Sequence, residues 1–172
     1  MQKKSSTQRL VMMAFLIALS VVLTRFCSIN TPIVRIGFGF LPCAFMGIIF
    51  GPIWAGIGYA AADVLGMAIF PTGVYFPGFT VTAFLTGIVY GIFYHNRDVT
   101  FRSSILPNLI ISIFLNLVLD TFWLMILMGQ GFLALLPARI IKCAVMFVIQ
   151  VTLIPLLWKN LMLRLPFSIL HQ

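Results

Sequence analysis

Long apolar stretches alternate with short polar or glycine- and proline-containing breaks along the whole 172-residue chain. These stretches lack a period of two, so they predict helices and not the strands of a β-barrel. At about 20 residues per membrane crossing plus short loops, the length allows about six membrane helices. The expected spans cover residues 9–24, 38–50, 54–70, 79–95, 104–127 and 135–158.

The composition agrees with this pattern. Hydrophobic residues make up 62% of the chain and charged residues 8%, and the mean hydropathy is +1.13. Soluble domains carry about 25% charged residues, so too few remain here to cover a water-facing surface. We therefore predict an all-α integral membrane protein, a six-transmembrane-helix bundle that forms a single domain over residues 1–172.

The distribution of positive charge predicts the orientation in the membrane. The net charge is +8. If the N-terminus is cytoplasmic, the inner segments hold Lys3, Lys4, Arg9, Arg97, Arg102, Lys159 and Arg164. The outer segments and helix ends hold Arg25, Arg35, Arg139 and Lys142. This excess inside fits the positive-inside rule and places both termini in the cytoplasm, but it assigns no role to the outer cations.

The basic start of the chain, before the first apolar run, could also belong to a signal peptide. No small-residue cleavage site followed by a polar mature chain is apparent, so we expect the first span to be retained.

The stretch from residue 70 to 91, FPTGVYFPGFTVTAFLTGIVYG, joins a broken aromatic loop to an apolar helix. Proline and glycine interrupt residues 71–78, and aromatic rings crowd the same segment. Gly87 and Gly91 form a small-xxx-small pair that predicts close helix packing. The topology places this corner on the outer side, where its rings could hold a flat ligand.

Polar and aromatic residues that are unusual in a membrane bundle gather toward the same outer half. They are Arg25, Arg35, Asp63, Tyr75, Phe79, Asn116, Asp120, Trp123, Arg139 and Lys142. Aromatic faces stack on planar rings, carboxylates accept paired hydrogen bonds, and cations bind anionic groups. The set predicts a ligand with a planar heterocycle that bears N–H donors and with an anionic tail.

Each of these residues also has a structural interpretation. A carboxylate inside the membrane, such as Asp63, could pair with a cation to hold the bundle together. The cations of the last span could extend to the headgroups, and the aromatic side chains could form an interfacial belt. Asn116 could make a hydrogen bond between helices, and Gln150, deep in the last span, is interpreted as structural.

The sequence carries no motif for an energy source or for catalysis. A G-x-x-x-x-G-K-[ST] phosphate loop is absent, and no Ser/His/Asp or Cys/His set falls at one depth. Cys27, Cys43 and Cys143 lack metal-ligand spacing. We expect a binding subunit that has no catalytic residues, metal or cofactor and that depends on partners for energy.

Several segments resemble the substrate-binding S component of an energy-coupling factor (ECF) transporter, in particular the folate-specific (FolT) family. They are residues 70–91, LDTFWL (119–124), LPARIIK (136–142), and FGFLP (38–42) followed by GIIFGPIWAGIGYAAAD (47–63). Ala14-x-x-x-Ala18 matches the docking motif in the first helix of that family.

The resemblance implies a vitamin site near the outer face, formed by the fourth to sixth helices and capped by the first, third and fifth loops. Folate would be the ligand, with its pterin held by Asp63 or Asp120 and Asp63 slightly preferred. Tyr75, Phe79 and Trp123 would contact the rings, and the outer cations would bind the glutamate tail.

The resemblance also implies partners and a location. Ala14 and Ala18 would dock on a transmembrane coupling subunit, and two cytoplasmic ATPase subunits would bind ATP. The complex would lie in a bacterial plasma membrane and take up folate. The alternatives are an S component for riboflavin or thiamine, and a small membrane enzyme or channel.

Overall fold

A computed structural model of the chain describes residues 6–26, 28–30, 35–71, 74–129 and 132–164. Its helices are α1 (Ser6–Arg25), α2 (Phe40–Phe50), α3 (Pro52–Ile69), α4 (Pro77–Tyr94), α5 (Phe101–Ile110), the π-helix η1 (Ile111–Leu119), α6 (Asp120–Met128) and α7 (Phe132–Arg164). Two short strands, β1 (Ser28–Asn30) and β2 (Arg35–Gly37), pair antiparallel.

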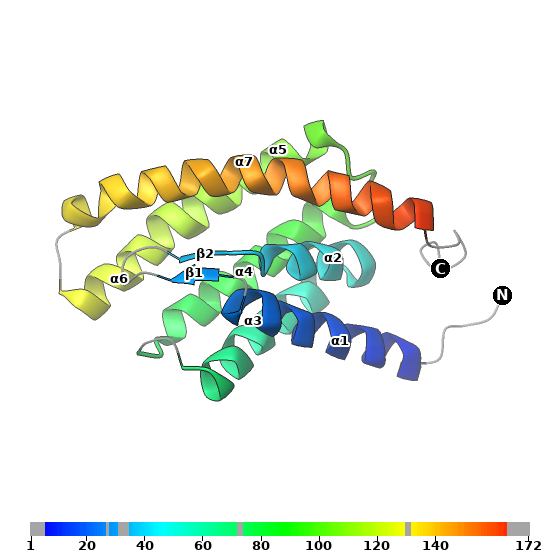
Figure 1. Ribbon diagram of the computed structural model, residues 1–172, viewed down its shortest axis with the longest axis horizontal. Helices are drawn as coiled ribbons and strands as arrows, with labels where there is room; N and C mark the ends of the chain where they lie inside the picture. Colours follow the sequence, from blue (N-terminus) through cyan, green and yellow to red (C-terminus); the bar gives the residue numbers. More distant parts are fainter. Residues whose placement is uncertain (1–5, 27, 31–34, 72–73, 130–131, 165–172) are drawn as a thin grey trace.

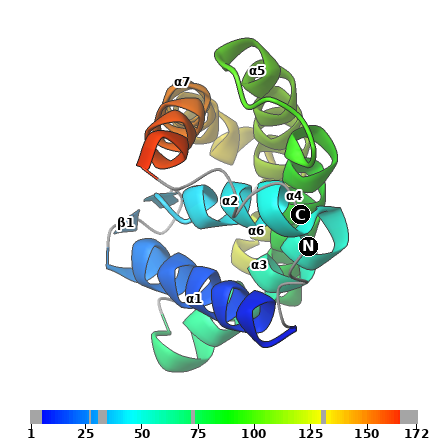
Figure 2. The ribbon, with the colours of Figure 1, turned by 90° about the vertical axis from the view of Figure 1, so that its right-hand side faces the viewer.

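The helices form a bundle in which α2 and α4 lie at the centre. Helices α1 and α3 pack on one side of this pair, and α5, η1 and α7 pack on the other (Figures 1 and 2). Helix α1 begins and α7 ends at one end of the bundle, here named the terminus end. The strands, the start of α4 and the start of α7 lie at the opposite end, the hairpin end (Figure 1).

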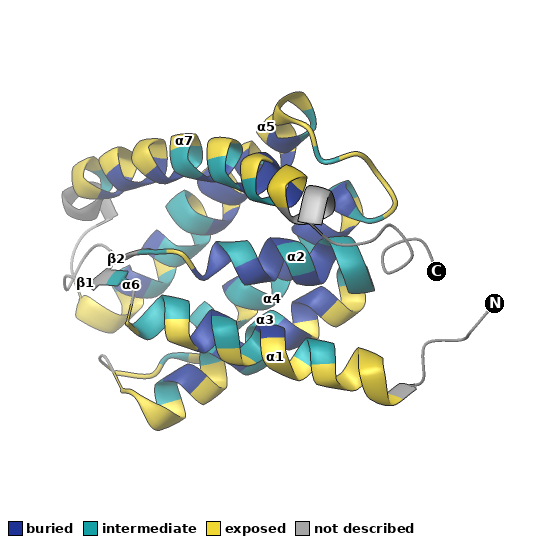
Figure 3. Cartoon of the chain, turned by 45° about the vertical axis from the view of Figure 1, so that its right-hand side comes forward, coloured by how far each residue is buried: buried dark blue, intermediate teal, exposed yellow. Residues whose placement is uncertain are grey.

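Within the described residues, five helical stretches are long and apolar enough to cross a membrane. They are Thr7–Arg25, Pro52–Ile69, Pro77–Tyr94, Phe101–Met128 and Leu136–Asn160. Figure 3 shows exposed residues along the outward faces of the helices, and many of them are large and apolar, such as Ile53 and Ile141, each 67% exposed. An apolar outside is the arrangement that lipid requires, so the prediction of a helical membrane protein is confirmed. The apolar helix α2 is shorter, at 11 residues.

Two local expectations are corrected by the structure. Between the first two expected spans, where the sequence pattern predicts only a loop, β1 and β2 form a hairpin in which Ser28 pairs with Gly37. The pairing satisfies backbone groups that would otherwise lack partners at this end of the bundle. Helix α4 begins at Pro77 and not at Phe79. Proline is tolerated in the first turn of a helix because the N–H that it lacks has no partner there.

Helices α3 and α4 meet through glycine, as the small-residue pair predicts. A Cβ added to Gly87 would lie 2.5 Å from the carbonyl oxygen of Ala55, and one added to Gly91 would lie 2.2 Å from Cα of Pro52. Both obstacles are backbone atoms, which cannot rotate away. The two helices therefore approach so closely that only glycine fits at these positions.

A matched pair of substitutions tests this contact. Gly91→Ala is expected to lower the free energy of unfolding by about 2 kcal/mol, because α4 must move away from Pro52. Gly58→Ala is expected to cost less, since its added Cβ would meet the flexible sulfur ends of Met46 and Met13. Thermal unfolding in detergent measures both variants. Equal losses would contradict the backbone contact as the cause.

Buried polar side chains line the contact between α4 and the α5–η1 helix. This polar seam consists of Thr82, Thr86, Tyr90, Tyr94, Ser104, Asn108 and Ser112. Tyr90 donates to Oδ1 of Asn108 at 2.9 Å, and Nδ2 of Asn108 donates to the Tyr94 hydroxyl at 3.3 Å. The two tyrosine rings stack with centroids 5.5 Å apart. The seam therefore joins α4 to α5 by hydrogen bonds within the membrane span.

Candidate binding pocket

A cavity of about 650 Å³ lies among the helices toward the hairpin end. Residues from α1, α2, α3, α4, η1, α6 and α7 line it, together with the segment between α3 and α4. The lining includes eight of the ten predicted site residues: Arg25, Asp63, Tyr75, Phe79, Asn116, Asp120, Arg139 and Lys142. Residues that are far apart in the sequence thus meet at one pocket.

The two remaining predicted residues have different positions. Arg35 lies in β2, at the hairpin end, and its side chain is outside the part of the chain that the structure describes. Trp123 lies behind the lining. Its indole donates from Nε1 to Oγ1 of Thr82 at 3.2 Å, and its ring packs with that of Phe76 at a centroid distance of 5.6 Å. Trp123 therefore supports the pocket wall.

One side of the pocket is built around Asp63. Thr80 donates to Oδ2 of Asp63 at 2.9 Å, and the Tyr75 hydroxyl lies 3.2 Å from the Thr80 hydroxyl. The side chain of Arg25 passes over α3 at Gly66, about one helical turn after Asp63. A Cβ on Gly66 would lie 2.9 Å from the Nε atom of Arg25. The glycine makes room for the guanidinium, and both Arg25 and Asp63 line the pocket, so this side combines an acceptor, hydroxyls and a cation.

The opposite side is built around Asp120. The charges of Lys142 and Arg139 both act on this carboxylate. Arg139 is 3% exposed and donates to Oγ1 of Thr121 at 3.1 Å and to the carbonyl oxygen of Asn116 at 3.3 Å. Lys142 is buried as well. Both cations are thus held inside the protein, which disfavours the interpretation that they extend to the headgroups.

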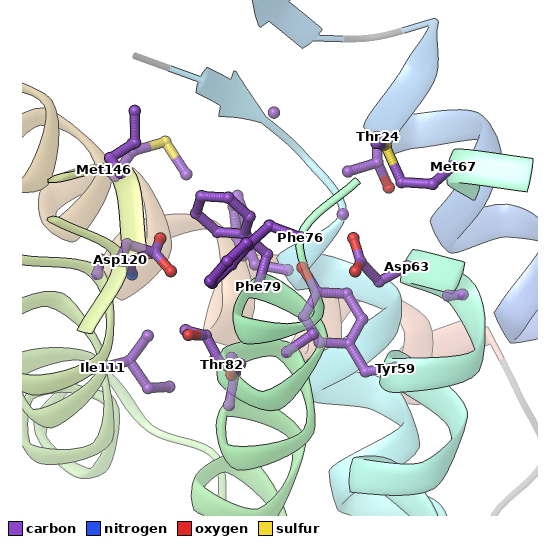
Figure 4. Close-up of a pocket in the computed structure, with 18 of the residues that line it drawn as sticks. Thr24, Tyr59, Asp63, Met67, Phe76, Phe79, Thr82, Ile111, Asp120 and Met146 are labelled. Atoms are coloured by element: carbon purple, nitrogen blue, oxygen red, sulfur yellow. The ribbon is translucent and has the colours of Figure 1, made fainter. Parts of the chain in front are cut away.

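Aromatic rings separate the two carboxylates. Figure 4 shows Asp63 and Asp120 on opposite sides of the rings of Phe76 and Phe79. The two rings meet edge to face, with centroids 6.2 Å apart and planes at 73°. Because stacking favours flat π-systems, the centre of the pocket suits a planar ring, and polar groups are available at its edges.

Spacings of four and three residues would place Asn116, Asp120 and Trp123 on one face of a regular α-helix. A face drawn through Asn116, Asp120 and Trp123 assumes α-helical hydrogen bonds throughout. In the π segment Ile111–Leu119 the bonds reach five residues along the chain, so α6, which carries both Asp120 and Trp123, is turned relative to the helix before it. Asn116 and Asp120 line the pocket, and Trp123 lies behind Phe76.

Several lining residues were missed by sequence reasoning. They are Tyr59, Phe76, Thr82, Thr86 and Gln150. Tyr59 precedes Asp63 by one helical turn, and the two threonines follow Phe79 at helical spacing, so helical periodicity was the available signal. Phe76 was part of the aromatic loop, but no spacing rule selects one ring of such a loop.

These features define a class: helical membrane proteins that enclose a solute-sized, charged and aromatic pocket among their helices. The family model described as "ECF-type riboflavin transporter, S component" matches residues 4–162. This chain therefore belongs to the S components of ECF-type transporters, as the sequence motifs indicated. Membership makes it a transport component and not an enzyme.

Named relatives and a solved structure agree with the family. The chain is 49% identical to the folate transporter FolT of Clostridium novyi over 87% of each chain. It is 32% identical to the folate transporter FolT of Leuconostoc mesenteroides, over 91% of this chain and 88% of the relative. A crystal structure of FolT bound with folic acid superposes with a TM-score of 0.86 at 41% identity, covering 90% of this chain and 95% of the other.

Proposed function

We propose that this chain is the folate-binding S component of an ECF transporter and that it delivers folate across the membrane with its partner subunits. The observation that carries the proposal is the content of the pocket. Aromatic rings lie between two carboxylates, and the cations Arg25, Arg139 and Lys142 share the lining. The similarity to relatives named as folate transporters supports the same ligand.

The chemistry of folate matches this lining. A pterin is flat and carries N–H donors on one edge, which a carboxylate accepts side by side. Asp63 is the better candidate for this edge, because Lys142 and Arg139 lie close enough to Asp120 for their charges to act on it. The glutamate tail is anionic, and three cations against two carboxylates leave an excess of positive charge to attract it.

Riboflavin is a second candidate because the matching family model carries its name. A flavin is also flat and would stack on the same rings. Its ribityl tail is uncharged, so it would leave the excess positive charge of the pocket without a partner. Thiamine is cationic and fits the lining less well still. The pocket therefore favours folate.

The proposed arrangement in the membrane follows from the helices. With α2 (Phe40–Phe50) as a short sixth span, both termini lie on one side, and the positive-inside rule makes that side the cytoplasm. The chain is then a single multi-pass domain of the cell membrane. It holds no cofactor of its own, since ATP would bind to the ATPase subunits.

The partners in this proposal are a transmembrane coupling subunit and two cytoplasmic ATPase subunits. Ala14 and Ala18 are the proposed docking residues for the coupling subunit. Both lie on the exposed surface of α1, beside the exposed Phe15. Small side chains on an exposed apolar helix allow a second helix to approach closely.

Binding measurements on the purified chain test the ligand. Titration calorimetry or ligand-induced thermal stabilisation is expected to give one folate per chain. Riboflavin and thiamine are expected to compete weakly or not at all. Absence of folate binding at micromolar concentrations would contradict the proposal, and tighter binding of riboflavin would favour the second candidate.

A further inference from the structure

The pocket contains a buried amide that none of the interactions described above uses. Gln150 lies on α7, lines the cavity and is 3% exposed. Its Oε1 atom has no hydrogen-bond partner within the described part of the chain. A buried acceptor without a partner costs free energy, and such groups are rare in folded proteins. Its position beside a cavity indicates that the partner arrives with the ligand.

Gln150 marks the deep end of the pocket. Helix α7 runs from the hairpin end to the terminus end (Figure 1). Gln150 lies two turns beyond Lys142 on the same face, which corresponds to about 12 Å along the helix axis. The two cations of α7 that line the pocket, Arg139 and Lys142, are therefore nearer the hairpin end, and the neutral amide lies deeper.

The other polar groups at this depth also present acceptors. The Thr86 hydroxyl donates its proton to the carbonyl oxygen of Thr82 at 2.8 Å, and the Ser20 hydroxyl is 3.5 Å from the carbonyl oxygen of Gly39. Both residues line the cavity. Because their protons are directed to the backbone, the oxygen lone pairs remain for other donors. The deep end of the pocket thus offers hydrogen-bond acceptors, and the lining cations Arg139 and Lys142 lie nearer the hairpin end.

We propose that Gln150 is a specificity-determining residue that accepts a hydrogen bond from an N–H group on the heterocycle of the ligand. The heterocycle enters first, and the anionic tail remains among the cations near the hairpin end. This inference rests on the proposed function, since it assigns one edge of folate to one residue. A 2-aminopyrimidinone edge carries more N–H bonds than one carboxylate accepts side by side, so Asp63 and Gln150 can both contact it.

Two substitutions test the inference. Gln150→Met keeps the length of the side chain and Gln150→Leu shortens it, and both remove the acceptor. Each is expected to weaken folic acid binding about tenfold, because a buried N–H of the ligand loses its partner. The ligand-free variants are expected to unfold at the same temperature as the unchanged protein or higher, since an unpaired buried carbonyl has been removed.

Pteroic acid, which is folic acid without the glutamate tail, identifies the part of the ligand that Gln150 contacts. The loss of affinity in both variants is expected to be the same factor for pteroic acid as for folic acid. A loss seen with folic acid but not with pteroic acid would assign Gln150 to the tail and overturn the inference.

Thr152→Val provides the control on the same helix. Thr152 is exposed and its hydroxyl bonds to the carbonyl oxygen of Val148, so this variant is expected to bind both ligands normally. Unchanged affinity in the Gln150 variants would overturn the inference alone. Failure of the unchanged protein to bind folic acid would overturn the proposed function, and the inference with it.

Discussion

Replacing Ala14 or Ala18 with tryptophan is expected to abolish folate uptake by the complete transporter and to leave folate binding by the isolated chain unchanged. Both alanines are exposed on α1 and neither lines the pocket. A tryptophan on this surface would hold a partner helix away, because close helix approach depends on small residues. Uptake of labelled folate into proteoliposomes that contain all subunits measures the effect.

Val148→Trp is the matched control for added bulk. Val148 is 60% exposed on α7, a helix on the other side of the bundle from α1. This variant is expected to support normal uptake and normal binding. Loss of folate binding in either alanine variant would contradict a docking role, and so would uptake at the normal rate.

The second large effect is expected at Asp63. Asp63→Asn is expected to weaken folate binding by about 100-fold, because a carboxylate that accepts paired N–H bonds is replaced by an amide that places a donor against one of them. The amide oxygen can still accept the bond from Thr80, so the fold should survive. Calorimetric titration gives the affinity, and thermal unfolding gives the stability of the ligand-free variant.

Asp120→Asn is the comparison that decides between the two carboxylates. This change leaves Lys142 and Arg139 without their counter-charge, so it is expected to reduce stability more than Asp63→Asn does. A larger loss of folate affinity from Asp120→Asn than from Asp63→Asn would assign the pterin to Asp120. If Asp63→Asn lowers stability and leaves affinity unchanged, Asp63 has a structural role.

The membrane helices were predictable because burial in lipid imposes a strong and continuous pattern on the sequence. Apolar stretches of sufficient length gave every long span to within a few residues. The limits of the helices were harder to predict where a proline is compatible both with a loop and with the first turn of a helix. From the local sequence, Pro77 is predicted to lie in the loop, but in the structure it lies in the first turn of α4.

The hairpin was not predictable from local sequence. Its strands have three residues each, too few for an alternating pattern to appear. The pairing of Ser28 with Gly37 requires a close approach of the two strands, since a Cβ at Gly37 would lie 2.9 Å from Cβ of Ser28. Such contacts are set by tertiary packing, and a single sequence carries little signal for them.

The charged residues of the pocket were predictable because charged side chains are unusual inside a membrane. Charged residues are rare in apolar spans, which singles out Asp63, Arg139 and Lys142. Their similar predicted depth in the membrane indicated one shared site, and all three line the pocket. Gln150 and Thr86 did not stand out, because uncharged polar residues also serve between helices. The π segment Ile111–Leu119 and the packing of Trp123 against Phe76 have no local sequence signature.

The polar seam limits which wall of the pocket can move. Separating α4 from α5 in the hydrocarbon would break the bonds of Tyr90 and Tyr94 with Asn108, and the hydrocarbon offers no water to replace them. Each lost bond would cost several kcal/mol. We therefore expect α4 and α5 to behave as a fixed partition. Motion that opens the pocket is then expected at walls other than the contact between α4 and α5.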